Sequence, residues 1–142
     1  MIVIYRKEAK IVDVKNLEHK PVVAFDFDAV ISTYNGWKGQ DVFGEPILDT
    51  IELMGHLQDE GYFITIFTTR LASPKLLQWL KDNNVRYDSI NSTSHNPPYT
   101  SIKPVFEVFI DDRAINFHGQ SAGELEQEIQ DLINTKHEIE KK

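Results

Sequence analysis

The sequence predicts an α/β fold, a three-layer Rossmann-like domain with a mainly parallel central sheet. Short, continuously apolar runs alternate along the chain with segments whose apolar residues recur at helical spacing. Aspartate and threonine follow directly after several of the apolar runs, and parallel sheets bind ligands beyond the carboxyl ends of their strands. The chain has 142 residues, which suits one domain. We therefore expect a single domain over residues 1–142, with a tail at 136–142 that frays.

The first half of the chain is expected to form two strands, each followed by a helix. The first strand covers 22–27, an almost continuous apolar run typical of a strand buried on both faces. Pro46 marks the first residue of the helix that follows, and Gly61 marks its left-handed end. A second strand over 62–67 leads to a helix with Ser73 as its N-cap.

The second half is expected to contain two more strands and a final helix. The strands cover 85–90 and 105–110, separated by an irregular loop at 91–99. Ser121 and Glu124 have the spacing of a capping box and predict the start of the last helix. This helix is expected to bury its apolar residues, which are Leu125, Ile129, Leu132 and Ile133.

The composition excludes several classes of function. The chain has no cysteine, which rules out disulfides, thiolate catalysis and cysteine-based metal sites. No apolar run approaches the ~20 residues that a membrane span needs, and the start does not resemble a secretory signal. These features predict a cytoplasmic protein that does not bind membranes.

The charge balance argues against nucleic acid as a partner. There are 15 basic and 22 acidic side chains, a formal net charge of −7, and an acidic surface repels phosphate backbones at long range. A phosphorylated small molecule stays compatible with this charge, because a bound cation can reverse the field locally.

Carboxylates follow the predicted strands at the edge where a ligand is expected. Asp26 and Asp28 end the first strand, Thr68 follows the second, and Asp111 with Asp112 follows the fourth. Carboxylates held this close cannot all ionise without a cation. Oxygen ligands with no histidine among them favour Mg²⁺ over zinc. The sequence therefore predicts a magnesium site made by these strand ends.

With a metal in place, the same residues suit phosphoryl transfer. One carboxylate can attack a phosphoryl group, and a second, two residues on, can act as general acid and base. The hydroxyl of Thr68 and the ammonium of Lys103 can bind the phosphoryl oxygens. Lys103 precedes Pro104, which favours an extended segment there.

The order of these residues resembles the haloacid dehalogenase (HAD) superfamily. The resemblance covers roughly residues 21–119 and rests on four motifs that occur in order: Asp26-Phe-Asp28-Ala-Val-Ile, Thr68, Lys103 and Phe-Ile-Asp111-Asp112. It implies that Asp26 is the nucleophile and a Mg²⁺ ligand. It also implies that Asp28 is the general acid and base, with its backbone carbonyl on the metal. An aspartate at this second position is typical of the phosphatase branch.

The resemblance assigns the remaining site residues in the same way. Thr68 matches the second-motif hydroxyl, Lys103 the third-motif lysine and Asp111 the metal-binding acid of the fourth motif. Asp112 matches a further acid that could bind the metal through water. Ala29 stands where many relatives have glycine, a departure that strains the loop if the backbone φ there is positive.

We expect from this a Mg²⁺-dependent phosphomonoester hydrolase that acts through an aspartyl-phosphate. Two alternatives stay open: a non-catalytic phosphate-binding or regulatory module with the same fold, and a phosphatase acting on nucleic-acid ends. The segments 32–45 and 71–102 are too short for the cap domain that such phosphatases often carry. The site is therefore expected to be open, for a small molecule or a macromolecule end, or covered by a neighbouring subunit of a homo-oligomer.

Four other residues near these motifs have a structural and a functional interpretation each. Arg70 and Arg113 flank the predicted site, and surface ion pairs are the favoured interpretation for both. Trp37 either closes over a substrate or packs its loop onto the domain. His95 is interpreted as a solvated loop residue near the edge of the sheet where the site lies.

Overall fold

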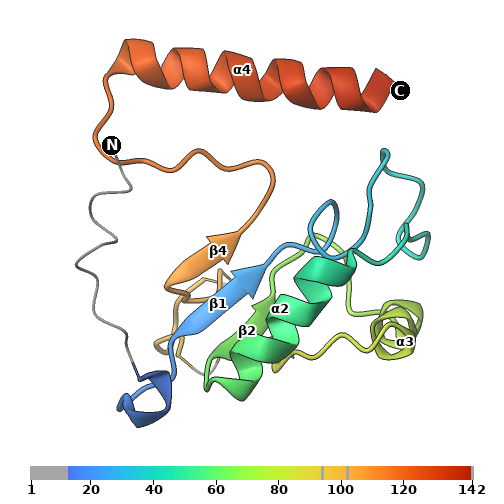
Figure 1. The fold of residues 1–142 in the computed structure, drawn as a ribbon, viewed down its shortest axis with the longest axis vertical. Helices are drawn as coiled ribbons and strands as arrows, with labels where there is room; N and C mark the ends of the chain where they lie inside the picture. The colour runs from blue at the N-terminus through green and yellow to red at the C-terminus, as the bar shows by residue number, and fades with distance from the viewer. Residues whose placement is uncertain (1–12, 94, 102, 142) are drawn as a thin grey trace.

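The computed structural model describes residues 13–93, 95–101 and 103–141, with side chains up to residue 136. These residues confirm the predicted α/β class: they form an all-parallel, four-stranded sheet with three α-helices, consistent with a Rossmann-like three-layer fold, and include no separate cap domain (Figure 1). The elements in chain order are η1 (Val14–Asn16), β1 (Val22–Phe25), α2 (Leu48–Asp59), β2 (Phe63–Ile66), α3 (Pro74–Asp82), β3 (Ser89–Ile90), β4 (Val108–Ile110) and α4 (Ala122–Lys141).

The sheet has the strand order β3-β2-β1-β4, so β1 lies in its interior between β2 and β4. Phe25, the last residue of β1, pairs with Ile66 on one side and with Ile110 on the other. The three strands therefore end level with one another. The polar residues that follow them start from the same edge of the sheet, as the sequence predicts.

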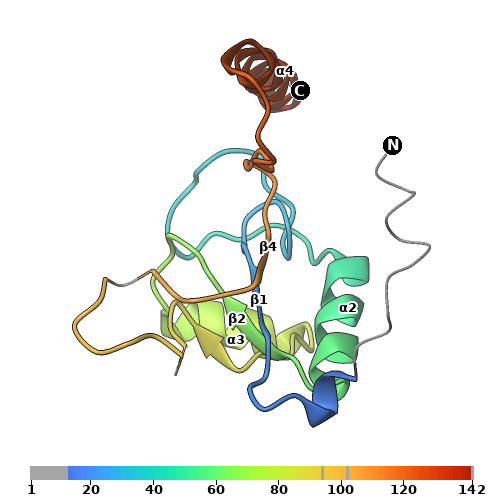
Figure 2. The same ribbon diagram turned by 90° about the vertical axis from the view of Figure 1, so that its left-hand side faces the viewer.

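Helix α2 covers one face of this sheet, and α3 lies beside it and contributes to the same core. Figure 1 shows α2 lying in front of β1 and β2, and Figure 2 shows it to one side of the strands. Their apolar side chains join those of the strands in one core: Val23, Phe25, Ile64 and Ile66 from the sheet with Ile51, Met54, Leu76 and Leu80 from the helices. Full burial of such a side chain stabilises the fold by about 1.5–3 kcal/mol. This core holds the strand ends rigid.

Helix α2 begins two residues later than predicted. Its first residue is Leu48, with Ile47 as N-cap, so Pro46 lies before the helix. Pro46 instead forms an antiparallel bridge with Ser32, which keeps it extended. The predicted end is confirmed, since Gly61 follows the helix with φ 103°, a conformation that favours glycine.

Strands β3 and β4 are shorter than predicted, and both are preceded by a carboxylate that replaces a ladder hydrogen bond. Asp88 donates its N–H to the carbonyl of Ile64 and accepts the Ile64 N–H on its side chain (2.7 and 2.8 Å). Glu107 makes the same two-way contact with Val22. A side-chain acceptor is local chemistry that a hydrophobic pattern does not reveal.

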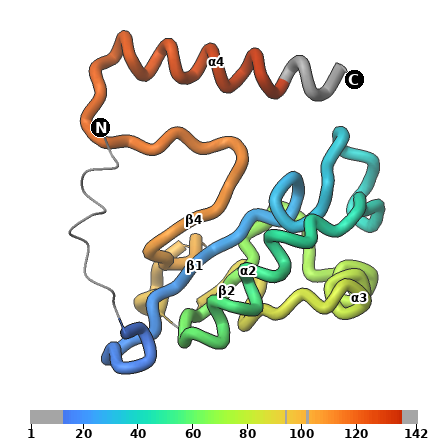
Figure 3. Tube along the Cα trace, viewed as in Figure 1, coloured from blue at the N-terminus to red at the C-terminus, as the bar shows by residue number. Residues whose placement is uncertain are grey.

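Helix α4 lies apart from the sheet, joined to β4 by residues 111–121 (Figures 1 and 3). The predicted capping box is confirmed, with Ser121 and Glu124 bonded in both directions. The predicted burial is wrong: Ile129 and Ile133 are 46% and 60% exposed. The helix ends at Lys141, and the fraying of residues 136–142 stays a prediction. Among the described helices, none has the length and apolarity that crossing a membrane requires.

The turn after β1 contains an alanine in the left-handed conformation. The carbonyl of Phe27 accepts hydrogen bonds from the N–H groups of Ile31 and Ser32 (2.9 and 3.0 Å). Closing this tight turn leaves Ala29 with φ 67°. An L-residue with a Cβ is strained in that region, so the departure from glycine noted in the sequence has a structural cost.

Replacing Ala29 with glycine is expected to stabilise the protein. The left-handed strain of about 1–2 kcal/mol is relieved, and the flexibility of glycine in the unfolded chain offsets about half of the gain. The free energy of unfolding, measured in urea, should rise by about 0.5–1 kcal/mol. The control Ala24→Gly, in buried β1, should lower it. An unchanged or lower value for Ala29→Gly would contradict the strain.

Candidate functional site

Three carboxylates meet beyond the carboxyl ends of β1 and β4. The N–H of Asp26 donates to the carbonyl of Ile110 (2.9 Å), which continues the ladder by one step and brings Asp26 beside Asp111. Asp26, Asp111 and Asp112 each offer an oxygen, and these oxygens all lie within 4.8 Å of one another. The structure therefore brings together three of the four predicted carboxylates.

The environment of Asp26 disfavours a negative charge. Burial is the main cause, followed by a hydrogen bond with the side chain of Asp111, and together they raise the pKa of Asp26 from 3.8 to about 7. The N–H of Phe27, which donates to Asp26 Oδ1 (2.8 Å), acts in the opposite direction. Nearby carboxylates of this kind are stabilised together by a bound cation.

The oxygens of Asp112 also fit a cation. Oδ2 accepts from the ammonium of Lys136 on α4, whereas Oδ1 is buried and has no hydrogen-bond partner in the described part of the chain. A buried, unpartnered carboxylate oxygen is costly in a folded protein. An oxygen-only donor set with one such atom suits a hard divalent ion such as Mg²⁺.

The fourth carboxylate, Asp28, is paired with arginine instead. Its two oxygens accept three hydrogen bonds of 2.9–3.1 Å from the guanidinium of Arg70. Arg70 is only 2% exposed, so the interpretation of this residue as a surface ion pair is wrong. The loop after β1 folds over Arg70 and buries it.

Arg70 also fixes the loop of residues 33–45. Its remaining N–H groups donate to the carbonyls of Gly39, Gln40 and Val42 at 2.5–3.1 Å. Its guanidinium lies over three aromatic rings, at 4.7–5.6 Å from their centroids: Phe27, Trp37 and Phe43. Arg70, which follows β2, thus holds both Asp28 and the loop of residues 33–45 in position.

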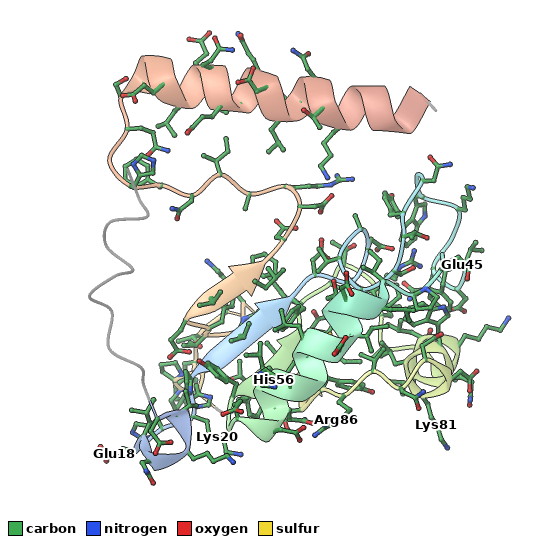
Figure 4. The ribbon with its side chains drawn as sticks, viewed as in Figure 1. Glu18, Lys20, Glu45, His56, Lys81 and Arg86 are labelled. Carbon is green, nitrogen blue, oxygen red and sulfur yellow. The ribbon has the colours of Figure 1, made fainter. Side chains whose placement is uncertain are left out.

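The base of loop 33–45 is closed by backbone contacts. The N–H of Thr33 donates to the carbonyl of Glu45, and the N–H of Glu45 donates to Thr33 Oγ1, both at 2.8 Å. A Cβ at Gly44 would lie 2.1 Å from the carbonyl oxygen of Thr33, so only glycine fits there. Glu45 is labelled in Figure 4, where it lies on the side of the molecule that carries α3.

Thr68 is held at the same edge of the sheet by Asn91. The amide oxygen of Asn91 accepts from the N–H of Thr68 (2.8 Å), and the N–H of Asn91 donates to Ile66 (2.7 Å). The hydroxyl oxygen of Thr68 accepts from the N–H of Arg70 (3.1 Å). This bond orients the hydroxyl and leaves its proton able to donate to a ligand.

Lys103 is not brought to the carboxylates. It is exposed, and its ammonium lies over the ring of Phe106, 5.9 Å from the centroid. That ring packs against Phe67 and Phe109, with centroids 6.3 and 5.2 Å apart. Lys103 therefore contacts an aromatic cluster that borders the site, and it does not line the pockets at the carboxylates.

Two adjoining pockets open at the carboxylates, and Asp26, Thr69 and Arg113 line both. One has a volume of about 170 Å³ and is also lined by Asp28, Tyr34 and Trp37. The other has a volume of about 270 Å³ and is also lined by Phe67, Thr68, Phe109 and Asp111. Asp26 thus lies at the junction of a pocket made by loop 33–45 and a pocket made by the strand ends.

Two residues of this site were not predicted from the sequence. Thr69 and Tyr34 line the pockets, and the signal for them is nearness in sequence to a strand end or motif. Arg113, for which the sequence favours a surface ion pair, lines both pockets. His95 is not near this edge of the sheet: its ring packs on Phe63, the first residue of β2, with centroids 5.8 Å apart.

Comparison with known proteins supports the fold. No protein-family model matches the chain, and no curated protein matches it in sequence. A solved structure, described as a conserved protein coded by a locus of Bacteroides thetaiotaomicron, is similar with a TM-score of 0.56 and 21% sequence identity. The match covers 80% of this chain and 92% of that one. At this identity the likeness shows a shared fold.

The carboxylate cluster predicts that Asp26→Asn stabilises the metal-free protein. The folded state holds the Asp26 proton up to about pH 7 and the unfolded state only to about 3.8, so the free energy of unfolding falls as the pH rises through this window. Asparagine cannot ionise, so the variant does not lose this stability as the pH rises. In EDTA at pH 8 the variant should be more stable by about 1 kcal/mol, after allowance for solvent screening, and the difference should vanish near pH 4.

Asp59→Asn is the matched control for this measurement. Asp59 accepts from Arg86, labelled in Figure 4, at 2.6 Å, and this contact lowers the pKa of Asp59. Its stabilising effect is present at neutral pH and lost in acid, so Asp59→Asn should lower stability at pH 8. If urea unfolding shows both variants shifting in the same direction, the interpretation of the Asp26 environment is wrong.

Removing the guanidinium of Arg70 is expected to destabilise the protein strongly. Arg70→Met leaves Asp28 and three carbonyls without their donor, and breaking a buried pair typically costs about 3–5 kcal/mol. Arg86→Met, at an exposed pair, should cost much less, because solvent screens an exposed pair. Urea unfolding of both variants measures the difference, and similar small losses would contradict the central role of Arg70.

Proposed function

We propose that the protein is a Mg²⁺-dependent phosphomonoester hydrolase of the HAD-like kind that acts through an aspartyl-phosphate. The observation that carries the proposal is the cluster of Asp26, Asp111 and Asp112 at the ends of β1 and β4. Its oxygens are close enough to share one cation, and Asp112 Oδ1 has no other partner among the described residues. Asp26 lies at the junction of two pockets, where a phosphoryl group could reach it.

In the first step, an oxygen of Asp26 attacks phosphorus. The P–O bond to the leaving group breaks, and the electron pair stays on the leaving oxygen. In the second step, water attacks the phosphorus of the aspartyl-phosphate, the P–O bond to Asp26 breaks, and inorganic phosphate leaves. Asp28 lines the same pocket as Asp26 and can take the proton of that water by giving up one of its contacts with Arg70.

The remaining residues bind the phosphoryl oxygens. The Thr68 hydroxyl, oriented by the N–H of Arg70, can donate to one of them. Arg113 lines both pockets and supplies positive charge at their junction. Lys103 keeps this role only if its exposed side chain moves from Phe106 toward Asp26. When bound by Asp26, Asp111 and Asp112, Mg²⁺ would neutralise the cluster and stabilise charge on the phosphoryl group.

The proposal predicts that hydrolysis of a phosphomonoester needs both Mg²⁺ and Asp26. Phosphate release should stop in excess EDTA and return with Mg²⁺. Asp26→Asn should abolish both turnover and the phosphoenzyme seen by mass spectrometry of acid-quenched protein, because an amide is a far weaker nucleophile. Asp28→Asn should lower the rate by about 10²–10⁴-fold.

Asp59→Asn, at the surface end of α2, is the control and should keep wild-type activity. Full activity in EDTA would overturn the metal assignment. A protein that binds Mg²⁺ at the cluster but hydrolyses no phosphomonoester would be a non-catalytic module instead.

A further inference from the structure

We propose that the pocket beside loop 33–45 binds the leaving group of the phosphoester, and that this leaving group is an aromatic ring joined directly to the ester oxygen. The substrates would then be phenolic phosphate esters. This inference rests on the proposed function, with Asp26 as nucleophile. It is carried by the walls of the pocket, by its size and by the charge of Arg113 that lines it.

The leaving group belongs in this pocket because Asp28 lines it. Asp28 contributes to the 170 Å³ pocket and not to the neighbouring one, whereas Thr68 contributes to the neighbouring one alone. A group that exchanges protons with the leaving oxygen or the incoming water has to lie on that side of phosphorus. The phosphoryl oxygens then face Thr68, and the leaving group points toward loop 33–45.

Trp37 forms a preformed aromatic wall of this pocket. The ring is 56% exposed, although tryptophan is normally well buried in a folded protein. It is held in place by Arg70, whose guanidinium lies 4.7 Å from the ring centroid. Because that guanidinium is fixed by Asp28 and by three loop carbonyls, the ring can receive a ligand without an ordering cost.

Tyr34 is a second aromatic group on the same pocket. It lies three residues before Trp37 in the loop, and the guanidinium of Arg113 is 5.9 Å from its ring centroid. Aromatic rings attract other rings by stacking or by edge contacts. Two such side chains around a small pocket favour a planar ring over a flexible polar chain.

The size of the pocket selects a single ring close to the phosphorus. Its volume is about 170 Å³, similar to that of cavities of about 150 Å³ that hold one benzene molecule. A nucleoside places a sugar between the phosphoryl group and its base, so the base would extend beyond this pocket. The ring of a phenolic ester is joined to the leaving oxygen itself.

The charge that lines the pocket favours the same class of leaving group. An alkoxide needs a proton in order to leave, whereas a phenolate leaves with its charge. Arg113, which lines the pocket, can stabilise that developing charge.

Ligand binding can be measured at Trp37 without catalysis. The chain has two tryptophans, so Trp79→Phe leaves Trp37 as the single reporter, and Asp26→Asn in that background prevents turnover. Phenyl phosphate with Mg²⁺ should change the fluorescence of Trp37 to saturation, and butyl phosphate should require at least about 5-fold more ligand. Equal affinities would overturn the aromatic assignment.

Kinetics with intact Asp26 tests specificity. Trp37→Ala should lower kcat/KM for phenyl phosphate by about 5- to 10-fold, mainly by raising KM, and should change butyl phosphate hydrolysis less than 2-fold. Tyr99→Ala removes an exposed aromatic side chain outside both pockets and should leave both substrates unchanged. Equal losses on both esters, or a preference of the wild type for a nucleoside 5′-monophosphate, would overturn the inference.

Two further comparisons remain. One distinguishes a small aryl phosphate from a phosphotyrosine protein as the substrate, and the other distinguishes failure of this inference from failure of the proposed function. A phosphotyrosine peptide with about the same kcat/KM as phenyl phosphate would identify the ring alone as the recognised group, whereas a value at least 10-fold higher would identify a protein substrate. Turnover without any preference for aryl esters overturns this inference alone. Saturable binding of phenyl phosphate at Trp37 without turnover of any ester overturns the proposed function and leaves the ring site in place.

Discussion

The geometry of the site depends on one buried cation, the guanidinium of Arg70. Removing such a charge from water costs several kcal/mol, and the chain offsets that cost by giving every one of its five N–H groups an acceptor. The acceptors come from Asp28 and from the carbonyls of loop 33–45. None of these groups can move alone without leaving a buried charge unpaired, so the turn after β1, the loop and the end of β2 form one rigid unit.

The fold and the position of the carboxylates could be predicted because both follow from local sequence patterns. Apolar runs and helix caps such as Ser73 and Gly61 define the elements. Parallel strands that end level then bring Asp26 and Asp111 together without any further information. The number of residues between Asp26 and Asp111 does not matter here, because the pairing of β1 with β4 brings them together.

The rest of the site could not be predicted, because it depends on contacts between residues far apart in sequence. Arg70 meets Asp28 across 42 positions and Gly39 across 31, and nothing near Arg70 distinguishes it from a surface arginine. The carboxylates of Asp88 and Glu107 replace ladder hydrogen bonds through partners 24 and 85 positions away. Amphipathic spacing in α4 predicts an apolar face correctly, but spacing does not reveal whether the linker 111–121 brings that face to the sheet.

The four aspartates thus differ in the groups that balance their charge, whichever motif they belong to. Asp28 has its counter-cation built into the chain, and both of its oxygens are occupied. Asp112 has Lys136 on one oxygen and nothing described on the other, whereas Asp26 and Asp111 have mainly each other. A permanent cation holds a carboxylate in one position, whereas carboxylates without one carry a negative charge that a bound cation can balance. The same loop that buries Arg70 therefore separates the carboxylate that arginine holds in place from the three whose charge a bound cation can balance.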